Sequence, residues 1–144
     1  MKYYKQKEEH TCGAACVRMI LEEAGTKKSE NEIINLLGTN KKEGTRNKSF
    51  SIAAEKLNLN YITGKNVSFK KLKELLKKGY KLITCYFLVS EDSGHYAVIK
   101  KIDKKYIYLL DPWFGPKTKY SLRYFRTVWR GKLNKEKAWF FGIK

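Results

Sequence analysis

The spacing of the apolar residues changes near residue 80 of this 144-residue chain, and this change constrains the fold more than any other feature. Before that point, segments such as 68–79 carry apolar residues three and four positions apart, as on one face of a helix. After it, segments such as 81–89 are apolar runs rich in β-branched and aromatic residues, which is typical of strands. The pattern therefore predicts the α+β class, with N-terminal helices packed on a C-terminal antiparallel sheet.

Start and stop signals predict where the helices begin and end. Ser29 and Glu32 form a capping box at the start of one helix, and Gly38 is its stop signal. Ser68 and Gly79 bound another helix in the same way. The helices are expected within 12–25, 29–38, 49–59, 68–79 and, in the second half, 121–131.

The predicted strands are short and are separated by turn residues. They are expected within 60–63, 81–89, 94–102, 106–112 and 137–143. Residues 103–105 form a tight connection between two of them. No internal repeat interrupts this order, so a single domain over 1–144 is expected.

Composition excludes several classes of protein. Hydrophobic residues make up 42% of the chain, which is enough for a packed core at this length. No apolar run reaches the roughly 20 residues that a membrane span needs. The first ten residues lack the apolar segment of a signal peptide, so a cytoplasmic protein is expected. Three cysteines are too few, and odd in number, for a disulfide framework. The oligomeric state stays open.

The net charge of +17 comes mainly from lysine, since only five of the 31 basic residues are arginine. Nucleic-acid readers often use Arg for bidentate contacts, and here the Lys residues are spread along the whole chain. This distribution favours a solvated basic surface over a dedicated nucleic-acid face. Such a surface could still attract an acidic peptide or an anionic membrane.

Cys12 lies at the point where the first helix is expected to begin. Unpaired backbone N–H groups and the positive end of the helix dipole favour a thiolate at such a position. A cysteine can also lie there for packing alone, because Cys is among the residue types most often buried. The other two cysteines, Cys16 and Cys85, are interpreted as small core residues.

His95 and Asp111 are expected near the same end of two neighbouring strands. With a three-residue hairpin loop, Ile102 faces Tyr106 and Ala97 faces Asp111. His95 is then a diagonal neighbour of Asp111, about 7–8 Å away between backbones and within reach of an imidazole–carboxylate hydrogen bond. A two-residue loop would place the two side chains on opposite faces of the sheet.

A thiol, an imidazole and a carboxylate together can perform acyl chemistry. Cys12 would attack a carbonyl, His95 would share its proton and later protonate the leaving group, and Asp111 would fix the imidazole tautomer. The backbone N–H of Cys12 and the side-chain amide of Gln6 are a fitting pair of donors for the developing oxyanion. Each residue alone also has a structural interpretation: a strand edge for His95, a turn for Asp111 and an exposed amide for Gln6.

A metal site is the competing interpretation of the segment HTCGAAC. His10, Cys12 and Cys16 are potential ligands, but the segment has no paired second cluster and no zinc-like spacing. Neither a metal nor another cofactor is therefore expected.

Several segments of the chain follow one another in the order of a known family. They are Gln6 followed six residues later by the CGAA of Cys12, then LLGTNKKEGT, AAEKLNL, LKELLKKGYKLIT, GHYAVIKKID, YIYLLDPWFG and a final Trp-x-Gly at Trp129. Their order and spacing resemble the papain-like cysteine peptidases of the double-glycine-leader type. These are the bacteriocin-processing domains that open many peptide-exporting transporters, and the resemblance covers nearly the whole chain.

The resemblance implies a role for each candidate residue. Cys12 corresponds to the nucleophile and His95 to the base. Asp111 corresponds to the orienting group and Gln6 to the oxyanion donor. The family packs the helix that carries the cysteine against the sheet that carries the other two. Thr11 departs from the family pattern, in which Asp commonly precedes the nucleophile. No transmembrane or ATPase segments follow, so a free-standing domain is expected.

The expected function is that of a cysteine hydrolase, a peptidase that acts on a peptide or protein through an acyl-enzyme on Cys12. Deamidation, transamidation and peptide cyclisation share this intermediate and differ only in the attacking group. A peptide-binding module that does not cleave is a third alternative, but a pure binder has no need of the thiol. Nucleic-acid binding ranks last, because it rests on charge alone.

Overall fold

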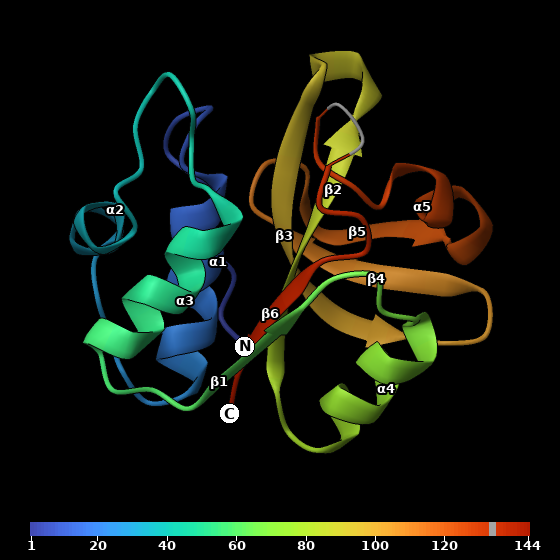
Figure 1. The fold of residues 1–144 in the computed structure, drawn as a ribbon, viewed down its shortest axis with the longest axis horizontal. Helices are drawn as coiled ribbons and strands as arrows, with labels where there is room; N and C mark the ends of the chain where they lie inside the picture. Colours follow the sequence, from blue (N-terminus) through green and yellow to red (C-terminus); the bar gives the residue numbers. More distant parts are fainter. Residues whose placement is uncertain (133–134) are drawn as a thin grey trace.

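The computed structural model describes residues 1–132 and 135–144, and helices cover both faces of its six-stranded antiparallel sheet (Figure 1). The helices are α1 (Cys12–Glu23), α2 (Glu30–Leu37), α3 (Asn47–Lys56), α4 (Phe69–Lys77) and α5 (Leu122–Val128), with a 3₁₀ turn η1 (Val89–Glu91). The strands are β1 (Tyr61–Gly64), β2 (Lys81–Leu88), β3 (Ser93–Ile102), β4 (Tyr106–Asp111), β5 (Gly115–Ser121) and β6 (Phe140–Ile143). The predicted α+β class is confirmed.

The strand order in the sheet is β1-β6-β2-β3-β4-β5. The last strand of the chain, β6, lies between β1 and β2 and joins the two halves of the sequence. The long strands β2 and β3 occupy the centre, where they pair from Leu82 with Ile99 to Leu88 with Ser93. This central pair carries His95, and the neighbouring strand β4 ends at Asp111.

The helices divide between the two faces of the sheet. Figure 1 shows α1, α2 and α3 on one side and α4 and α5 on the other. Ile83 and Val98 pack with α1 in one apolar cluster, while Leu82 and Ile99 pack with α4 in a second. Because both faces are covered, β2 is a continuous apolar run rather than an alternating one. The sequence predicted helices packed on the sheet but not their division between its two faces, of which α4 and α5 cover the second.

The predicted helix caps are confirmed. The Ser29 and Ser68 hydroxyls accept hydrogen bonds from main-chain N–H groups three residues further on, at 3.2 and 3.1 Å. Gly38 ends α2 in the left-handed conformation with φ 66°, which glycine adopts without steric cost. Each side-chain cap stabilises its helix by about 1 kcal/mol.

Strand β5 was not predicted from the sequence. Its residues GPKTKYS include glycine, proline and two lysines, all of which are depleted in strands. The strand is the outermost one beyond β4, and an edge strand tolerates Pro116 because one side of its backbone has no partner strand. The short turn from β4 into β5 matters for function, because it follows Asp111 directly.

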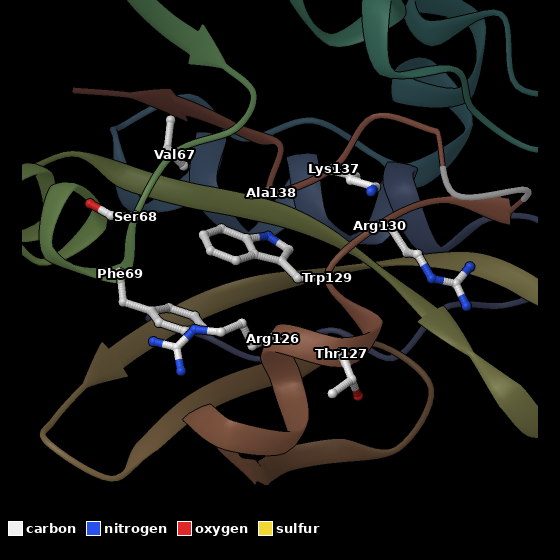
Figure 2. Close-up of a pocket in the computed structure, with 9 residues that line it drawn as sticks. All are labelled: Val67, Ser68, Phe69, Arg126, Thr127, Trp129, Arg130, Lys137 and Ala138. Carbon is white, nitrogen blue, oxygen red and sulfur yellow. The ribbon is translucent and has the colours of Figure 1, made fainter.

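The α4–α5 side has a cavity of about 490 Å³ (Figure 2). Phe69 stacks on Trp129 there with ring centroids 4.8 Å apart, and Figure 2 shows the Arg126 side chain extending past Phe69. Arg130 and Lys137 add two further cations to its lining. None of the candidate catalytic residues borders this cavity, so it is separate from the site described below. Among the helices of the described residues, none is long and apolar enough to cross a membrane.

Candidate active site

Cys12 is the first residue of α1, as the sequence predicts. The N-cap residue Thr11 makes no side-chain capping bond to the helix. Its hydroxyl instead donates to the carbonyl of Glu8 at 3.0 Å and accepts from the N–H of Glu8 at 3.1 Å. The first N–H groups of α1 are therefore left uncapped by this side chain beside the thiol. Cys12 is 8% exposed and borders the cleft.

His95 and Asp111 are joined by a hydrogen bond between His95 Nε2 and Asp111 Oδ1 at 2.8 Å. Both side chains are buried, Asp111 completely. Since Nε2 is engaged by Asp111, Nδ1 is the ring nitrogen left for the thiol. Interaction with Cys12 is one of the causes that raise the pKa of the ring.

The register that brings these two side chains together differs in part from the prediction. Ile102 pairs with Ile107, so the predicted pairing of Ile102 with Tyr106 is wrong. A β-bulge between Ile99 and Lys101 then shifts the register by one residue. Beyond the bulge Val98 pairs with Leu110, which is the register that the sequence predicts for this end of the strands. The bulge thus restores the face on which His95 meets Asp111.

The His95–Asp111 pair shifts the pKa of both groups. Burial alone would lower the pKa of His95, but hydrogen bonds with Asp111 and Cys12 outweigh it and raise the pKa to about 9. Burial acts to raise the pKa of Asp111, but the hydrogen bonds from His95 and Tyr86 outweigh it and bring the pKa below its usual value. An imidazolium–carboxylate pair is therefore the favoured state at neutral pH.

Gln6 is buried beside the cleft and is held there by its main chain. Its backbone N–H donates to the carbonyl of Pro112 at 2.8 Å. Its side-chain Nε2 donates to the carbonyls of Glu8 at 2.8 Å and Glu9 at 3.2 Å. Its Oε1 is buried without a hydrogen-bond partner among the described residues. In this arrangement both amide hydrogens of Gln6 are directed at main-chain carbonyls rather than into the cleft.

The cleft is a cavity of about 410 Å³ between the start of α1 and the β2–β3 hairpin. Gln6, Cys12 and His95 all border it, and Asp111 lies behind His95. The 41–45 loop forms another part of its wall, and Trp113 forms part of its rim. The structure thus brings together all four residues that the sequence singled out.

The turn that the sequence offered as the structural role of Asp111 is present beside its bond to His95. The main-chain N–H groups of Trp113 and Phe114 donate to Asp111 Oδ1 at 2.9 and 3.0 Å. An Asp before Pro112 is a signal for such a turn, and the carboxylate serves both the turn and His95. The sequence analysis missed Tyr86, whose hydroxyl donates to Asp111 Oδ2. A tyrosine in a buried strand has no sequence signal for this contact.

The other two thiols lie in the core. Burial raises the pKa of Cys16 well above its usual value and raises the pKa of Cys85 to about 12. His10, the third member of the metal interpretation, borders the cleft and lies 3.6 Å from a carboxylate oxygen of Glu8. Residues 1–132 and 135–144 contain no group of three or more side chains arranged to hold a metal ion.

The helix that begins at Cys12 packs against the antiparallel sheet that carries His95, which is the arrangement of the papain-like fold. A family model described as the peptidase C39 family matches residues 1–134, so the chain belongs to that family. No curated protein matches the chain.

Solved structures share the fold at low sequence identity. A putative C39-like peptidase from Bacillus anthracis is 13% identical with a TM-score of 0.76, over 99% of this chain and 94% of that one. The peptidase domain of Streptococcus ComA, a bifunctional ABC transporter, is 23% identical with a TM-score of 0.76. The match covers 99% of this chain and 96% of that domain. A double-glycine-motif protease from an AMS/PCAT transporter, solved in complex with the leader peptide, is 19% identical with a TM-score of 0.76. The match covers 99% of this chain and 90% of that one.

Proposed function

We propose that this member of the peptidase C39 family cleaves a peptide bond through an acyl-enzyme on Cys12, with His95 as the acid–base and Asp111 as its orienting group. The observation that carries the proposal is the 2.8 Å bond from His95 to the buried Asp111, beside a thiol at a helix start. A thiolate on Cys12 is balanced by the His95 imidazolium, which persists at neutral pH because the pKa of His95 is raised to about 9.

The reaction follows from these groups. The Cys12 thiolate attacks the scissile carbonyl, and the tetrahedral intermediate collapses when the His95 imidazolium gives its proton to the leaving amine. Water then adds to the thioester while His95 takes its proton, which releases the acid product and the free thiol. Asp111 keeps the ring in one orientation throughout, since Nε2 is bonded to its carboxylate.

The oxyanion needs donors close to the thiol. The N–H of Cys12 is one of the helix-terminal donors that Thr11 does not cap. We propose the side-chain amide of Gln6 as the second donor, which requires an N–H of that amide to turn from the carbonyl of Glu8 or Glu9 toward the cleft.

The substrate class comes from the relatives. One solved relative is a double-glycine-motif protease bound to a leader peptide. We propose a peptide substrate with two glycines before the scissile bond, placed in the cleft that Cys12 and His95 border. Acyl transfer to another amine, deamidation or cyclisation on the same thioester is the second candidate, because the nucleophile that resolves it comes from outside these residues.

Mass spectrometry against a peptide library tests the proposal. The wild type should release two fragments from double-glycine peptides, and Cys12→Ala should release none. Cys16→Ala is the matched control, because it removes a thiol from the core side of the same helix. Cleavage that persists in Cys12→Ala would contradict the proposal. Binding without cleavage by the wild type would favour a peptide-binding module instead.

A further inference from the structure

We infer that Tyr86 is a positioning residue that fixes the Asp111 carboxylate and, through it, the orientation and acidity of the His95 ring. The inference rests on the proposed function for its role in turnover. Its structural basis is the buried hydrogen bond from the Tyr86 hydroxyl to Asp111 Oδ2.

The two oxygens of Asp111 have different partners. Oδ1 accepts from His95 Nε2 and from the main-chain N–H groups of Trp113 and Phe114, at 2.8, 2.9 and 3.0 Å. Oδ2 accepts from Tyr86. The turn and His95 thus donate to Oδ1. Among these donors only Tyr86 donates to Oδ2, so Tyr86 fixes the rotation of the carboxylate about its Cβ–Cγ bond.

The position of Tyr86 in the sheet makes this contact specific. Tyr86 on β2 is the direct cross-strand partner of His95 on β3, so both side chains lie on the same face. Their rings meet edge to face with centroids 5.5 Å apart. Both reach Asp111, which lies at the end of the next strand, β4.

The Tyr86 hydroxyl is a donor rather than an acceptor at this site. Tyr86 is only 1% exposed, so water does not compete for the bond. Burial and the charge of Asp111 raise the pKa of Tyr86, which keeps its proton in place. On its other side the Tyr120 hydroxyl from β5 lies 3.4 Å from that of Tyr86.

Loss of the hydroxyl changes what Asp111 does to His95. A buried carboxylate oxygen without a donor is destabilised, and the remaining negative charge acts more strongly on the imidazolium. The titratable groups that face the His95–Asp111 pair are Cys12 and Cys16 from α1, Tyr86 from β2, Tyr120 from β5 and Tyr3 from the N-terminal segment. Of these only Tyr86 donates directly to Oδ2 in the described structure.

Tyr86 also packs in the core, with its ring centroid 5.4 Å from that of Phe125. A packing role alone would be kept by Tyr86→Phe, which preserves the ring and removes only the hydroxyl. Tyr108→Phe is the matched control, because the Tyr108 hydroxyl also donates to a carboxylate, that of Asp103, at the far end of β4.

The test measures kcat, KM and the pH profile of the purified full chain on a cleaved double-glycine peptide. Tyr86→Phe should lower kcat roughly 10- to 100-fold with little change in KM, because the substitution displaces the His95 ring and not the bound substrate. The alkaline limb of the profile should move up by roughly half a pH unit or more, since the more exposed charge of Asp111 holds the imidazolium proton more tightly. Tyr108→Phe should match the wild type in all three.

A second measurement is independent of turnover. The His95 ring nitrogens are followed by ¹⁵N NMR against pH in a Cys12→Ala background, with and without Tyr86→Phe. An upward shift of the His95 titration supports the inference even if no peptide is cleaved, so its failure is separable from that of the proposed function. Tyr120→Phe should give a smaller shift of the same sign and serves if Tyr86→Phe does not fold. An unchanged titration in the folded variants, or a loss of stability alone, would overturn the inference.

Discussion

The backbone N–H of Gln6 bonds to the carbonyl of Pro112 at 2.8 Å, so two residues that lie far apart in the sequence are joined at the edge of the cleft. The Tyr3 hydroxyl adds a 2.6 Å bond to the carbonyl of Asp111. The N-terminal segment is thereby fixed to the end of β4, which ends at Asp111. The segment that carries the proposed oxyanion donor, Gln6, is therefore hydrogen-bonded to the strand end that carries the proposed orienting group, Asp111.

Gln6→Ala tests whether this residue acts in the reaction or only in the structure. As an oxyanion donor, Gln6 should contribute a factor of roughly 10²–10³ to kcat, with a smaller change in KM. If Gln6 only ties the carbonyls of Glu8 and Glu9 before α1, its loss should lower the free energy of unfolding and leave kcat of the folded enzyme unchanged. Kinetics and denaturant unfolding of the same variant separate the two results.

The three proposed catalytic residues should differ in how much activity their loss removes. Cys12→Ala should abolish turnover, and His95→Ala should nearly do so. Asp111→Asn keeps the shape and should leave measurable activity, because a thiolate beside a helix start depends less on the third residue than a serine does. Equal residual activity in all three variants would contradict the assigned roles.

Alkylation distinguishes the three thiols. Cys12 borders the cleft, whereas burial raises the pKa of Cys16 well above its usual value and the pKa of Cys85 to about 12. Iodoacetamide near neutral pH should therefore label Cys12 much faster than the other two, as measured by peptide mapping. His95→Ala should slow the labelling of Cys12. Labelling of all three at one rate, or only after unfolding, would show that Cys12 is not activated.

The His95–Asp111 pair should make stability depend on pH. The pKa of His95 is raised from about 6.5 to about 9, so above pH 6.5 the folded state binds more protons than the unfolded state. Stability from this group is complete below pH 6.5 and declines as the pH rises toward 9. The free energy of unfolding should fall by roughly 1 kcal/mol between pH 6.5 and 7.5, below the range in which unfolded thiols lose their protons.

His95→Ala should remove this decline, whereas His10→Ala, which removes the other histidine, should keep it. Denaturant unfolding at several pH values measures the slope directly. A wild-type protein whose stability is flat or rises over this window would show that the imidazolium is not favoured by folding.

Local signals predicted much of the fold. Ser29 and Ser68 cap the starts of α2 and α4, and Gly38 ends α2. Because capping depends on the residue type and its near neighbours, these helix boundaries could be predicted from the sequence. Strand β5 could not be predicted, because only its place beyond β4 makes a sequence with Pro116 acceptable as a strand.

The bulge in β3 had a signal that was overlooked. Ile99 and Ile102 are both buried in the same apolar cluster, yet they are three positions apart, which a regular strand cannot place on one face. Lys100 and Lys101 between them are both exposed, and the bulge accommodates this pattern. The Tyr86 contact had no such signal, since it depends on the pairing of three strands.

Cleavage of a double-glycine peptide in ¹⁸O-labelled water tests the central claim most directly. Hydrolysis of a thioester on Cys12 adds one oxygen from water to the new carboxyl end of the leader fragment. We predict that the wild type yields this fragment with ¹⁸O in its terminal carboxyl group, and that Cys12→Ala yields no fragment. A wild-type product that lacks ¹⁸O and is instead joined to an amine or cyclised would contradict the assignment as a peptidase.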